Sequence, residues 1–271
     1  MKRLVFLAAL VLVSPALAAT PAQIVAKLNA QRVANGIPGG IVLDPAWTTG
    51  CEHHIRYEEL NGIGWTHNEV AGKPGWTHDG MLAGLQGDQA DTGGYDSGNP
   101  YENLPLHLAG QLAPQLQRVG AYESGVRTCV QLAGGWTRQF ASNTIYTYPG
   151  GGRTGVQTSQ DVHGEWPTSP GAVVGLPQGT TTGPTIYVFA VGPIASQQPR
   201  LASAHLVGPG APVNIRLVDP SQHAQLKYEL LPGIFFLVPV SPLAPHTRYT
   251  ATVTVQSKGP TLTKHWSFVT A

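Results

Sequence analysis

Hydrophobic residues recur at helical spacing near the start of the chain, and turn residues divide them into two segments. The first segment follows Thr20-Pro21-Ala22-Gln23, a capping box with proline at the first helical position, and it ends at Gly36. The second is predicted from Asp44-Pro45 to the Asn61-Gly62 pair, where glycine is typical of a helix end. This part of the chain therefore predicts two helices in succession.

Two shorter helices are predicted before the hydrophobic period changes. Asp79 is expected to cap the third helix, and the fourth contains the leucines between positions 104 and 116, where Pro114 is expected to break or bend it. Apolar and polar residues then alternate from Val126 to Leu132, which predicts a strand. Helices thus precede strands along the chain, and this order is typical of an α+β fold.

Short strands and turns dominate the second half of the chain. Residues 134–185 show little periodicity and are rich in Gly, Pro, Ser and Thr, whereas Ile186–Val191 is a clear apolar strand. Ser196-Gln197-Gln198-Pro199 is predicted to be a linker. The segments beyond it have the spacing of a small β-sandwich: VNIRLVD, LKYELL, IFFLVPV, RYTATVTV and HWSFVT.

The N-terminus has the pattern of a secretory signal peptide. Lys2 and Arg3 precede a short apolar run, which leads to Ser14-Pro15-Ala16-Leu17-Ala18-Ala19, and cleavage is expected near Ala18 or Ala19. The apolar run is too short to cross a bilayer, which takes about 20 residues. We therefore expect a secreted, extracellular protein that does not span a membrane.

Charge and cysteine content narrow the possible partners. Charged residues make up 11% of the chain and the net charge is +1, so nothing favours binding to nucleic acid. The two cysteines of an exported chain, Cys51 and Cys129, are most simply explained by one disulfide. The alternative is a catalytic thiol, but no Cys-His-Asn signature accompanies either cysteine.

The sequence Gly-Trp-Thr-His occurs twice, ending at His67 and at His78. An acidic residue follows each histidine closely, Glu69 after the first and Asp79 after the second. Histidines and carboxylates are common metal ligands and catalytic groups, so the repeat is a candidate site. Two turns of similar composition would explain the same pattern without any site.

The first half of the chain resembles the CAP superfamily, the secreted SCP or PR-1-like proteins, in their bacterial form. Each motif is weak alone, but their order matches the family over a large part of the chain. The matching pieces are Leu28-Asn29-x-x-Arg32, NGIPGGIVLDPAW, the Cys51–Asn61 helix, His67, PGWTHDG, Leu106-His107 and LAPQLQRVGAY.

This resemblance implies an α-β-α sandwich with a central groove, in which two histidines and two acids can hold a divalent cation such as zinc. His67 matches the first family histidine and His107 the second. The family's Gly-Glu-Asn motif falls near Gly80-Met81, where this chain has no glutamate. The remaining candidates for the acids are Glu69, Asp79 and Glu102, and His78 is a further candidate for the groove.

The end of the chain resembles bacterial immunoglobulin-like domains. The resemblance rests on Pro-x-Thr-x-Tyr at 245–249, which is similar to a tyrosine corner, and on the closing Trp-Ser-Phe-Val-Thr. Fibronectin type III is the close alternative. The expected organisation is a signal peptide at 1–19, a CAP-like domain at 20–195 with an irregular extension from about 134, and an immunoglobulin-like sandwich at 196–271.

Three functions are compatible with these patterns. The first is a secreted, non-enzymatic CAP-domain protein that binds a divalent metal, a small apolar or lipid-like ligand or a cell-envelope component in its histidine-lined groove. The second is a metal-dependent hydrolase that uses His67 and His107 as ligands. The third is a structural or adhesion protein of the envelope.

Overall fold

The computed structural model describes residues 18–165, 168–227 and 229–271. The signal peptide expected at residues 1–19 therefore lies almost entirely outside the described residues. Both helices and sheets are present, which confirms the α+β class. Within the described ranges, no helix is long and apolar enough to cross a membrane.

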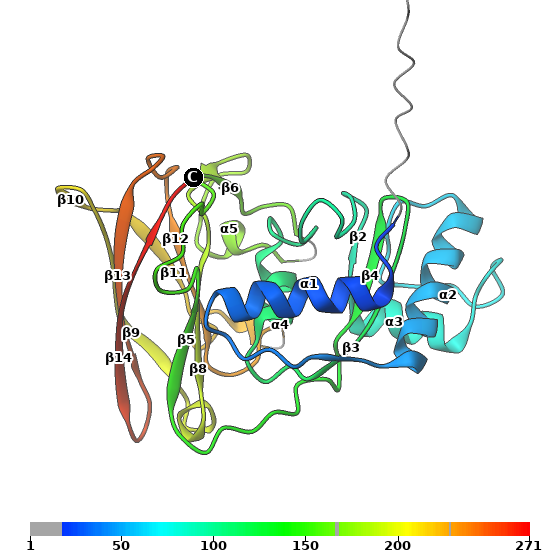
Figure 1. The fold of residues 1–271 in the computed structure, drawn as a ribbon, viewed down its shortest axis with the longest axis horizontal. Helices are drawn as coiled ribbons and strands as arrows, with labels where there is room; N and C mark the ends of the chain where they lie inside the picture. The colour runs from blue at the N-terminus through cyan, green and yellow to red at the C-terminus, as the bar shows by residue number, and fades with distance from the viewer. Residues whose placement is uncertain (1–17, 166–167, 228) are drawn as a thin grey trace, which may run out of the picture.

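Four-stranded sheet β1-β3-β4-β2 forms the centre of the helical half, and helices cover both of its faces (Figure 1). On one face, α1 and α4 pack on Val119, Ala121 and Val130, while α2 and α3 pack around the two cysteines on the other. The strands are β1 (Val42–Leu43), β2 (Gly87–Ala90), β3 (Arg118–Ser124) and β4 (Arg127–Gln131). The helices are α1 (Pro21–Ala34), α2 (Pro45–Asn61), α3 (His78–Gln86) and α4 (Pro105–Leu112).

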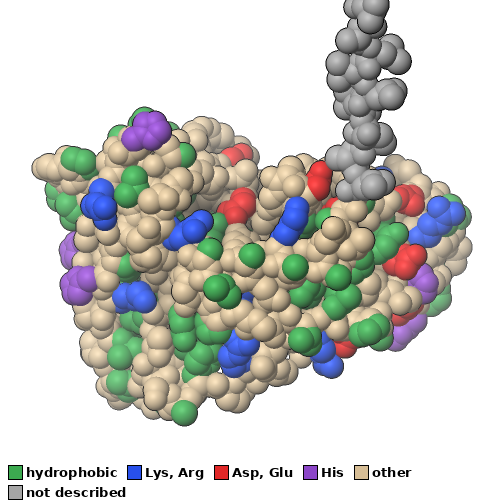
Figure 2. All heavy atoms as spheres, viewed as in Figure 1, with side chains coloured by type: hydrophobic (Ala, Val, Ile, Leu, Met, Phe, Trp, Pro, Cys, Tyr) green, Lys and Arg blue, Asp and Glu red, His purple; other side chains and the backbone are tan. Residues whose placement is uncertain are grey.

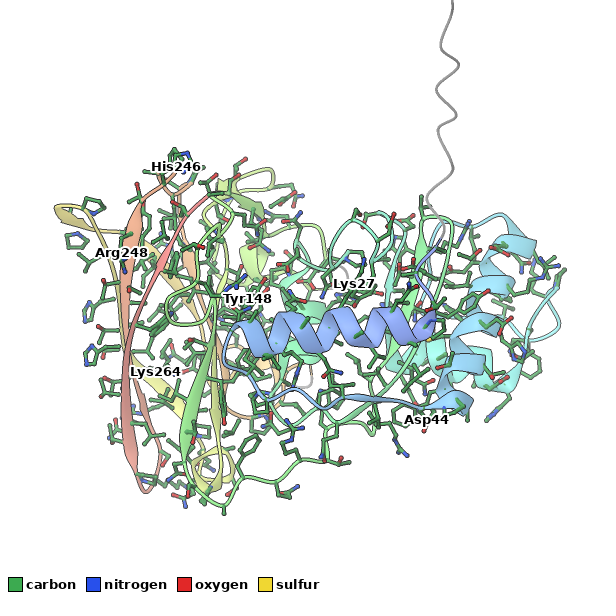
Figure 3. The ribbon with its side chains drawn as sticks, viewed as in Figure 1. Lys27, Asp44, Tyr148, His246, Arg248 and Lys264 are labelled. Atoms are coloured by element: carbon green, nitrogen blue, oxygen red, sulfur yellow. A yellow bond between two sulfur atoms is a disulfide. The ribbon has the colours of Figure 1, made fainter. Side chains whose placement is uncertain are left out.

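Local sequence determines the ends of the first two helices as expected. Thr20 and Gln23 form the reciprocal hydrogen bonds of a capping box at the start of α1. Asp44, labelled in Figure 3, caps α2 by accepting from the Trp47 backbone N–H at 3.0 Å. Gly62 ends α2 in the left-handed conformation, with φ 63°, which glycine adopts without steric cost. Both predicted helices are confirmed.

The third and fourth helices exist, but their ends differ from the prediction. Thr77, not Asp79, caps α3, because its hydroxyl accepts from the Gly80 backbone N–H at 3.0 Å. Asp79 instead lies in the first turn of that helix. The fourth helix ends at Leu112, two residues before Pro114, because proline disfavours helical backbone in the residue that precedes it.

Two further sheets pack face to face in the other half of the molecule (Figure 1). The inner sheet has the order β11-β12-β8-β5 and the outer sheet the order β10-β9-β13-β14. The inner strands are β5 (Thr144–Tyr148), β8 (Ile186–Val191), β11 (Ile215–Val218) and β12 (Ile234–Pro239). The outer strands are β9 (Arg200–Gly208), β10 (Ala211–Pro212), β13 (Arg248–Gln256) and β14 (Thr261–Val269).

Short elements connect these sheets. They are β6 (Gln160–Asp161), α5 (Pro170–Val173), β7 (Thr181–Thr182) and the 3₁₀ turns η1 (Pro193–Ser196) and η2 (Ala224–Leu226). The expected strand LKYELL at 226–231 is wrong, because the described part of that segment is turn and 3₁₀ structure. Strands β5 and β9 were not expected, since one lies in the weakly periodic stretch and the other follows the expected linker.

Strands β8 and β12 are buried along their whole length because both faces of the inner sheet are covered. Tyr187, Phe189 and Phe236 share a core with α1 and α4, whereas Val188 and Phe235 pack on the outer sheet. The domain boundary expected at residues 195 and 196 stays a prediction. Backbone hydrogen bonds nevertheless join the two sides of that boundary, because β8 precedes residue 195 and pairs with β12, which follows residue 196.

The Tyr249 hydroxyl accepts a hydrogen bond from the Ala244 backbone N–H at 2.8 Å. Tyr249 is the second residue of the long strand β13, so this contact fastens the preceding loop to the outer sheet. A tyrosine that bonds backbone just upstream is the contact expected of a tyrosine corner.

The expected disulfide is confirmed. Cys51 of α2 and Cys129 of β4 are linked, and both are fully buried beside Ile55 and Ala83. The bond joins a helix to the central strand of the sheet across 78 sequence positions. Closing so long a loop restricts the unfolded chain.

We expect replacement of both Cys51 and Cys129 by alanine to lower the free energy of unfolding by about 4 kcal/mol, the value for a loop of this length in the chain-entropy model. Urea unfolding followed by circular dichroism would measure it. Reduced wild-type protein serves as the control, because it loses the link but keeps both side chains. Equal stability of the oxidised wild type and the double variant would contradict the expectation.

Candidate functional site

His67 and His107 come together although they lie on different elements. His67 follows α2 in a loop, and His107 is in the first turn of α4. Their ring centroids are 5.9 Å apart with an interplanar angle of 20°, so the imidazoles are stacked. Both rings line one open cavity of about 400 Å³. The two histidines that the family resemblance assigns to one groove therefore lie side by side in one cavity.

A buried carboxylate that the sequence did not point to holds His107 in place. Glu165 accepts from the backbone N–H groups of Leu106 at 2.8 Å and His107 at 3.0 Å. It also faces the His107 ring, with 2.7 Å between Oε1 and Nδ1. These N–H groups have no acceptor within the helix because they belong to its first turn, and an anion is favourable at a helix N-terminus. Glu165 therefore fixes both the helix and the ring.

The other end of α4 is held by a buried cation. Arg32 is fully buried, and its Nη1 donates to the carbonyls of Gln111 at 2.6 Å and Ala113 at 3.0 Å. Burial and the nearby Arg138 lower the pKa of Arg32 to about 9. A cation satisfies the free carbonyls at a helix C-terminus. Helix α4 thus has a carboxylate at its start and a guanidinium at its end.

The two imidazoles differ in protonation. Burial alone would lower the pKa of His107, but the hydrogen bond to Glu165 and the charge of Asp88 outweigh it and raise that pKa to about 9. Burial lowers the pKa of His67. The hydrogen bond to the Gly84 carbonyl raises that pKa in part, but the charge of the neighbouring His107 lowers it further. At neutral pH, His107 is therefore an imidazolium and His67 a neutral imidazole.

One nitrogen of each ring remains for a ligand. The His67 Nδ1–H donates to the Gly84 carbonyl at 2.8 Å, so its unprotonated Nε2 can accept a hydrogen bond. His107 uses Nδ1 toward Glu165, so its protonated Nε2 can donate one. The Tyr101 ring stacks on His107 as well, at 5.9 Å, and favours the cationic form.

Asp88 adds a titratable group to the same cavity. It lies on β2, is buried, and accepts from the Gln111 side chain at 2.7 Å. Burial raises the pKa of Asp88 to about 7. The charge of His107 and the hydrogen bond from Gln111 oppose this rise, and the charge of Glu165 adds to it. Its protonation therefore changes near neutral pH.

Part of the cavity wall is apolar, although Gln86, Thr168 and Glu229 line it too. The large apolar side chains are those of Leu85, Leu106, Leu132 and Trp136. Leu85 is 53% exposed at the end of α3, so it lies open to solvent although it is large and apolar. The Trp136 indole N–H donates to the Gly110 carbonyl at 3.0 Å, which holds the ring against α4. The cavity therefore has a polar part and an apolar part.

Glu69 and His78 do not line this cavity. Glu69 is buried against α2, where Oε1 lies 3.0 Å from Nδ1 of His54 and Oε2 accepts from the Thr77 backbone N–H at 3.3 Å. It thus ties the loop before α3 to α2. His78 is exposed at the start of α3.

Glu102 lines two other cavities, of about 210 and 470 Å³. Its carboxylate accepts from the Tyr148 hydroxyl at 2.8 Å and from the Gln31 side chain. Lys27 and Tyr148, labelled in Figure 3, line the larger one. Figure 2 shows the surface hollowed between the helical half and the β half. The structure therefore places Glu102 apart from the histidine pair.

The donor set does not fit a resident metal ion. In the described ranges, no three or more His, Cys, Asp or Glu side chains are arranged to hold one. Glu69 and Glu102 are bonded elsewhere, and Glu165 is occupied by α4. Two imidazoles alone fall short of the ligand number of a zinc site. A divalent cation here stays a prediction of the family resemblance.

Local sequence carried little signal for Glu165 and Asp88. Glu165 follows a histidine and a glycine in the weakly periodic stretch, 58 positions from His107. Asp88 belongs to a short strand without apolar alternation. Leu104, the N-cap of α4, supplies no side-chain cap, but the sequence prediction had placed it inside the helix and so did not show that α4 needs an anion from elsewhere.

No protein-family model matches this chain, and no curated protein matches its sequence. The CAP and immunoglobulin-like resemblances therefore stay predictions.

We expect Glu165→Gln to lower the pKa of His107 from about 9 toward its ordinary value of about 6.5, because the neutral amide no longer stabilises the imidazolium. NMR titration of the ring would measure this. Glu229→Gln is the matched control, since this exposed acid lines the same cavity and raises the His107 pKa least of the stated causes. Equal pKa values in wild type and Glu165→Gln would contradict the assignment.

We expect wild-type protein to lose stability relative to Asp88→Asn between pH 4.5 and about 7.5. The folded-state pKa of Asp88 is raised to about 7, so the fold prefers the protonated carboxyl. The stability that this preference contributes is fully present below the unfolded pKa of about 3.9 and is lost as pH rises through 7. The relative loss is at most about 4 kcal/mol. Urea unfolding at several pH values would measure it, with exposed Asp96→Asn as control. A pH-independent difference would exclude this ionisation.

Proposed function

We propose that this chain is an exported, CAP-type binding protein whose His67–His107 cavity takes a small lipid-like molecule. The observation that carries the proposal is the stacked imidazole pair, in which each ring is held through Nδ1 and keeps Nε2 for a ligand. Preorganised polar groups beside apolar side chains are typical of small-molecule sites.

The polar end of the ligand would carry a hydroxyl or a carbonyl. His67 Nε2 is an acceptor and His107 Nε2 a donor, so a hydroxyl group can donate to one ring and accept from the other. A simple carboxylate is less suitable, because the acidic residues Asp88 and Glu165 line the same cavity and would repel it. Recognition would therefore favour a neutral head group.

The apolar end of the ligand would lie against Leu85, Leu132 and Trp136. A cavity of about 400 Å³ is in the range of small-ligand sites and suits a short acyl chain with its head group. The exposed Leu85 supports this placement, because a bound chain would remove its side chain from water.

The scaffold fits the proposed family. Helices on both faces of a four-stranded sheet agree with the α-β-α sandwich that the resemblance implies. The two packed sheets of the β half agree with an immunoglobulin-like sandwich that also takes β5 and β8 from before residue 196. In this proposal the immunoglobulin-like sandwich acts as a spacer or docking surface for the cell envelope.

The hydrolase and adhesion alternatives stay predictions. A metal-dependent hydrolase would need a third protein ligand beside His67 and His107, and the described residues offer none in suitable geometry. A purely adhesive role leaves the preorganised imidazoles without a purpose.

The test uses 1-monocaprin, a neutral monoglyceride, as the probe below its aggregation threshold. We expect saturable quenching or enhancement of tryptophan fluorescence, because Trp136 lines the cavity. Leu85→Arg should weaken binding about tenfold or more by placing a charge where the acyl chain lies, a difference of about 1.4 kcal/mol.

Leu60→Arg is the matched control, because Leu60 is a similarly exposed leucine, at 45%, outside the cavity. It should bind the probe like the wild type, and both variants should keep the wild-type melting temperature. The proposal is wrong if monocaprin does not bind, or if Leu85→Arg and Leu60→Arg bind it equally.

A further inference from the structure

The backbone nitrogen of Ala19 lies at an unusual position. Ala19 immediately precedes Thr20, the cap of α1, and is only 8% exposed. Its N–H donates directly to Oε1 of Glu123, a residue of β3. The chain therefore enters the folded structure with this one nitrogen against a carboxylate.

Glu123 is enclosed by backbone. The residue is 5% exposed, and its second oxygen, Oε2, accepts from the Tyr95 backbone N–H at 2.9 Å. A Cβ atom at Gly94 would lie 2.8 Å from both carboxylate oxygens, so only glycine leaves room for the carboxylate there. Lys27, labelled in Figure 3, donates to the carbonyl of the same Tyr95 and so fixes this segment.

None of the ion pairs in the described part of the chain includes Glu123, so no cation there is paired with this buried carboxylate. Burying a carboxylate is costly unless it is paired with a cation or well hydrogen-bonded. The backbone N–H groups of Ala19 and Tyr95 compensate in part, but an ammonium at the Ala19 nitrogen would stabilise the carboxylate far better.

The sequence supplies such an ammonium at Ala19. Ala16-Leu17-Ala18 has the Ala-x-Ala pattern that precedes a signal-peptide cleavage point, which would lie between Ala18 and Ala19. Hydrolysis there breaks the Ala18–Ala19 peptide bond. The hydroxyl of water joins the Ala18 carbonyl carbon, a proton joins the Ala19 nitrogen, and a second proton from solvent makes it an ammonium.

We propose that a signal peptidase cleaves between Ala18 and Ala19, and that the new α-ammonium of Ala19 forms a buried ion pair with Glu123. The proposal rests on the export that is part of the proposed function. Cleavage converts an amide contact into a charged one at a site already shaped for it. The carboxylate also lies at the N-terminus of α1, where an anion is favourable and where it offsets the new positive charge.

The ion pair is tested in vitro without relying on export. A fusion partner removed by a specific protease can leave Ala19 as the first residue of an otherwise complete mature chain. The rate of acylation of the α-amine by acetic anhydride, followed by peptide mass spectrometry over a range of pH, gives its pKa. We expect a value about one unit or more above the usual range of about 7.7–8.0 for an α-amino group, and about tenfold slower acylation at neutral pH.

Two variants and one control separate the causes. Glu123→Gln should return the α-amine to the usual pKa, and so should a chain that begins at Ala18, because the extra residue displaces the charge from the carboxylate. Exposed Glu52→Gln should leave the raised pKa unchanged. The chain beginning at Ala18 keeps the test decisive if Glu123→Gln fails to fold. An ordinary pKa in the chain that begins at Ala19 overturns the ion pair.

A second measurement tests the cleavage point. The full chain, expressed with its own N-terminus in a secreting bacterial host, should yield exported protein that begins at Ala19 by N-terminal sequencing. A start at any other residue overturns the cleavage point, and material that keeps residues 1–18 overturns export as well. Neither result depends on monocaprin, so failure of the cavity's proposed function is recognised separately.

Discussion

The carboxylate of Glu165 is the contact on which the arrangement of the cavity depends. Helix α4 has only eight residues and no cap from its own sequence, so it is too short to be stable by itself. Glu165 satisfies the N–H groups at its start, and Arg32 satisfies the carbonyls at its end. The same carboxylate orients His107 and keeps it protonated. One buried acid thereby sets the position of the helix, the direction of the ring and the charge in the cavity.

That charge gives two identical side chains opposite properties. His67 is hydrogen-bonded to a backbone carbonyl and its pKa is lowered, whereas His107 faces carboxylates and retains its proton. A donor and an acceptor thus lie stacked side by side in a cavity that Leu85, Leu132 and Trp136 also line. Buried Glu123, at the N-terminus of α1, follows the same physical rule, since a carboxylate away from water requires positive charge or several N–H donors.

Features encoded by neighbouring residues were predictable from sequence, and features that depend on distant ones were not. Thr20, Asp44 and Gly62 act within a few residues, so the first two helices were predicted with the correct ends. The pairing of His67 with His107 came from the order of motifs along the chain. Glu165 acts across 58 positions, and β5 pairs with β8 across a long irregular segment, so nothing local revealed either. Thr77 competed with Asp79 for the cap of α3, and two suitable residues so close together could not be ranked from the pattern alone.

The two covered faces of the inner sheet have a consequence for how this chain can be divided. Strand β8 presents Tyr187 and Phe189 to the helices, Val188 to the outer sheet, and one edge to β12. A cut near residue 196 would leave that strand with a row of free peptide groups and an uncovered apolar surface, both of which promote aggregation. The helical half and the β half are therefore interdependent: shuffling either one alone into another protein would require new residues to cover β8.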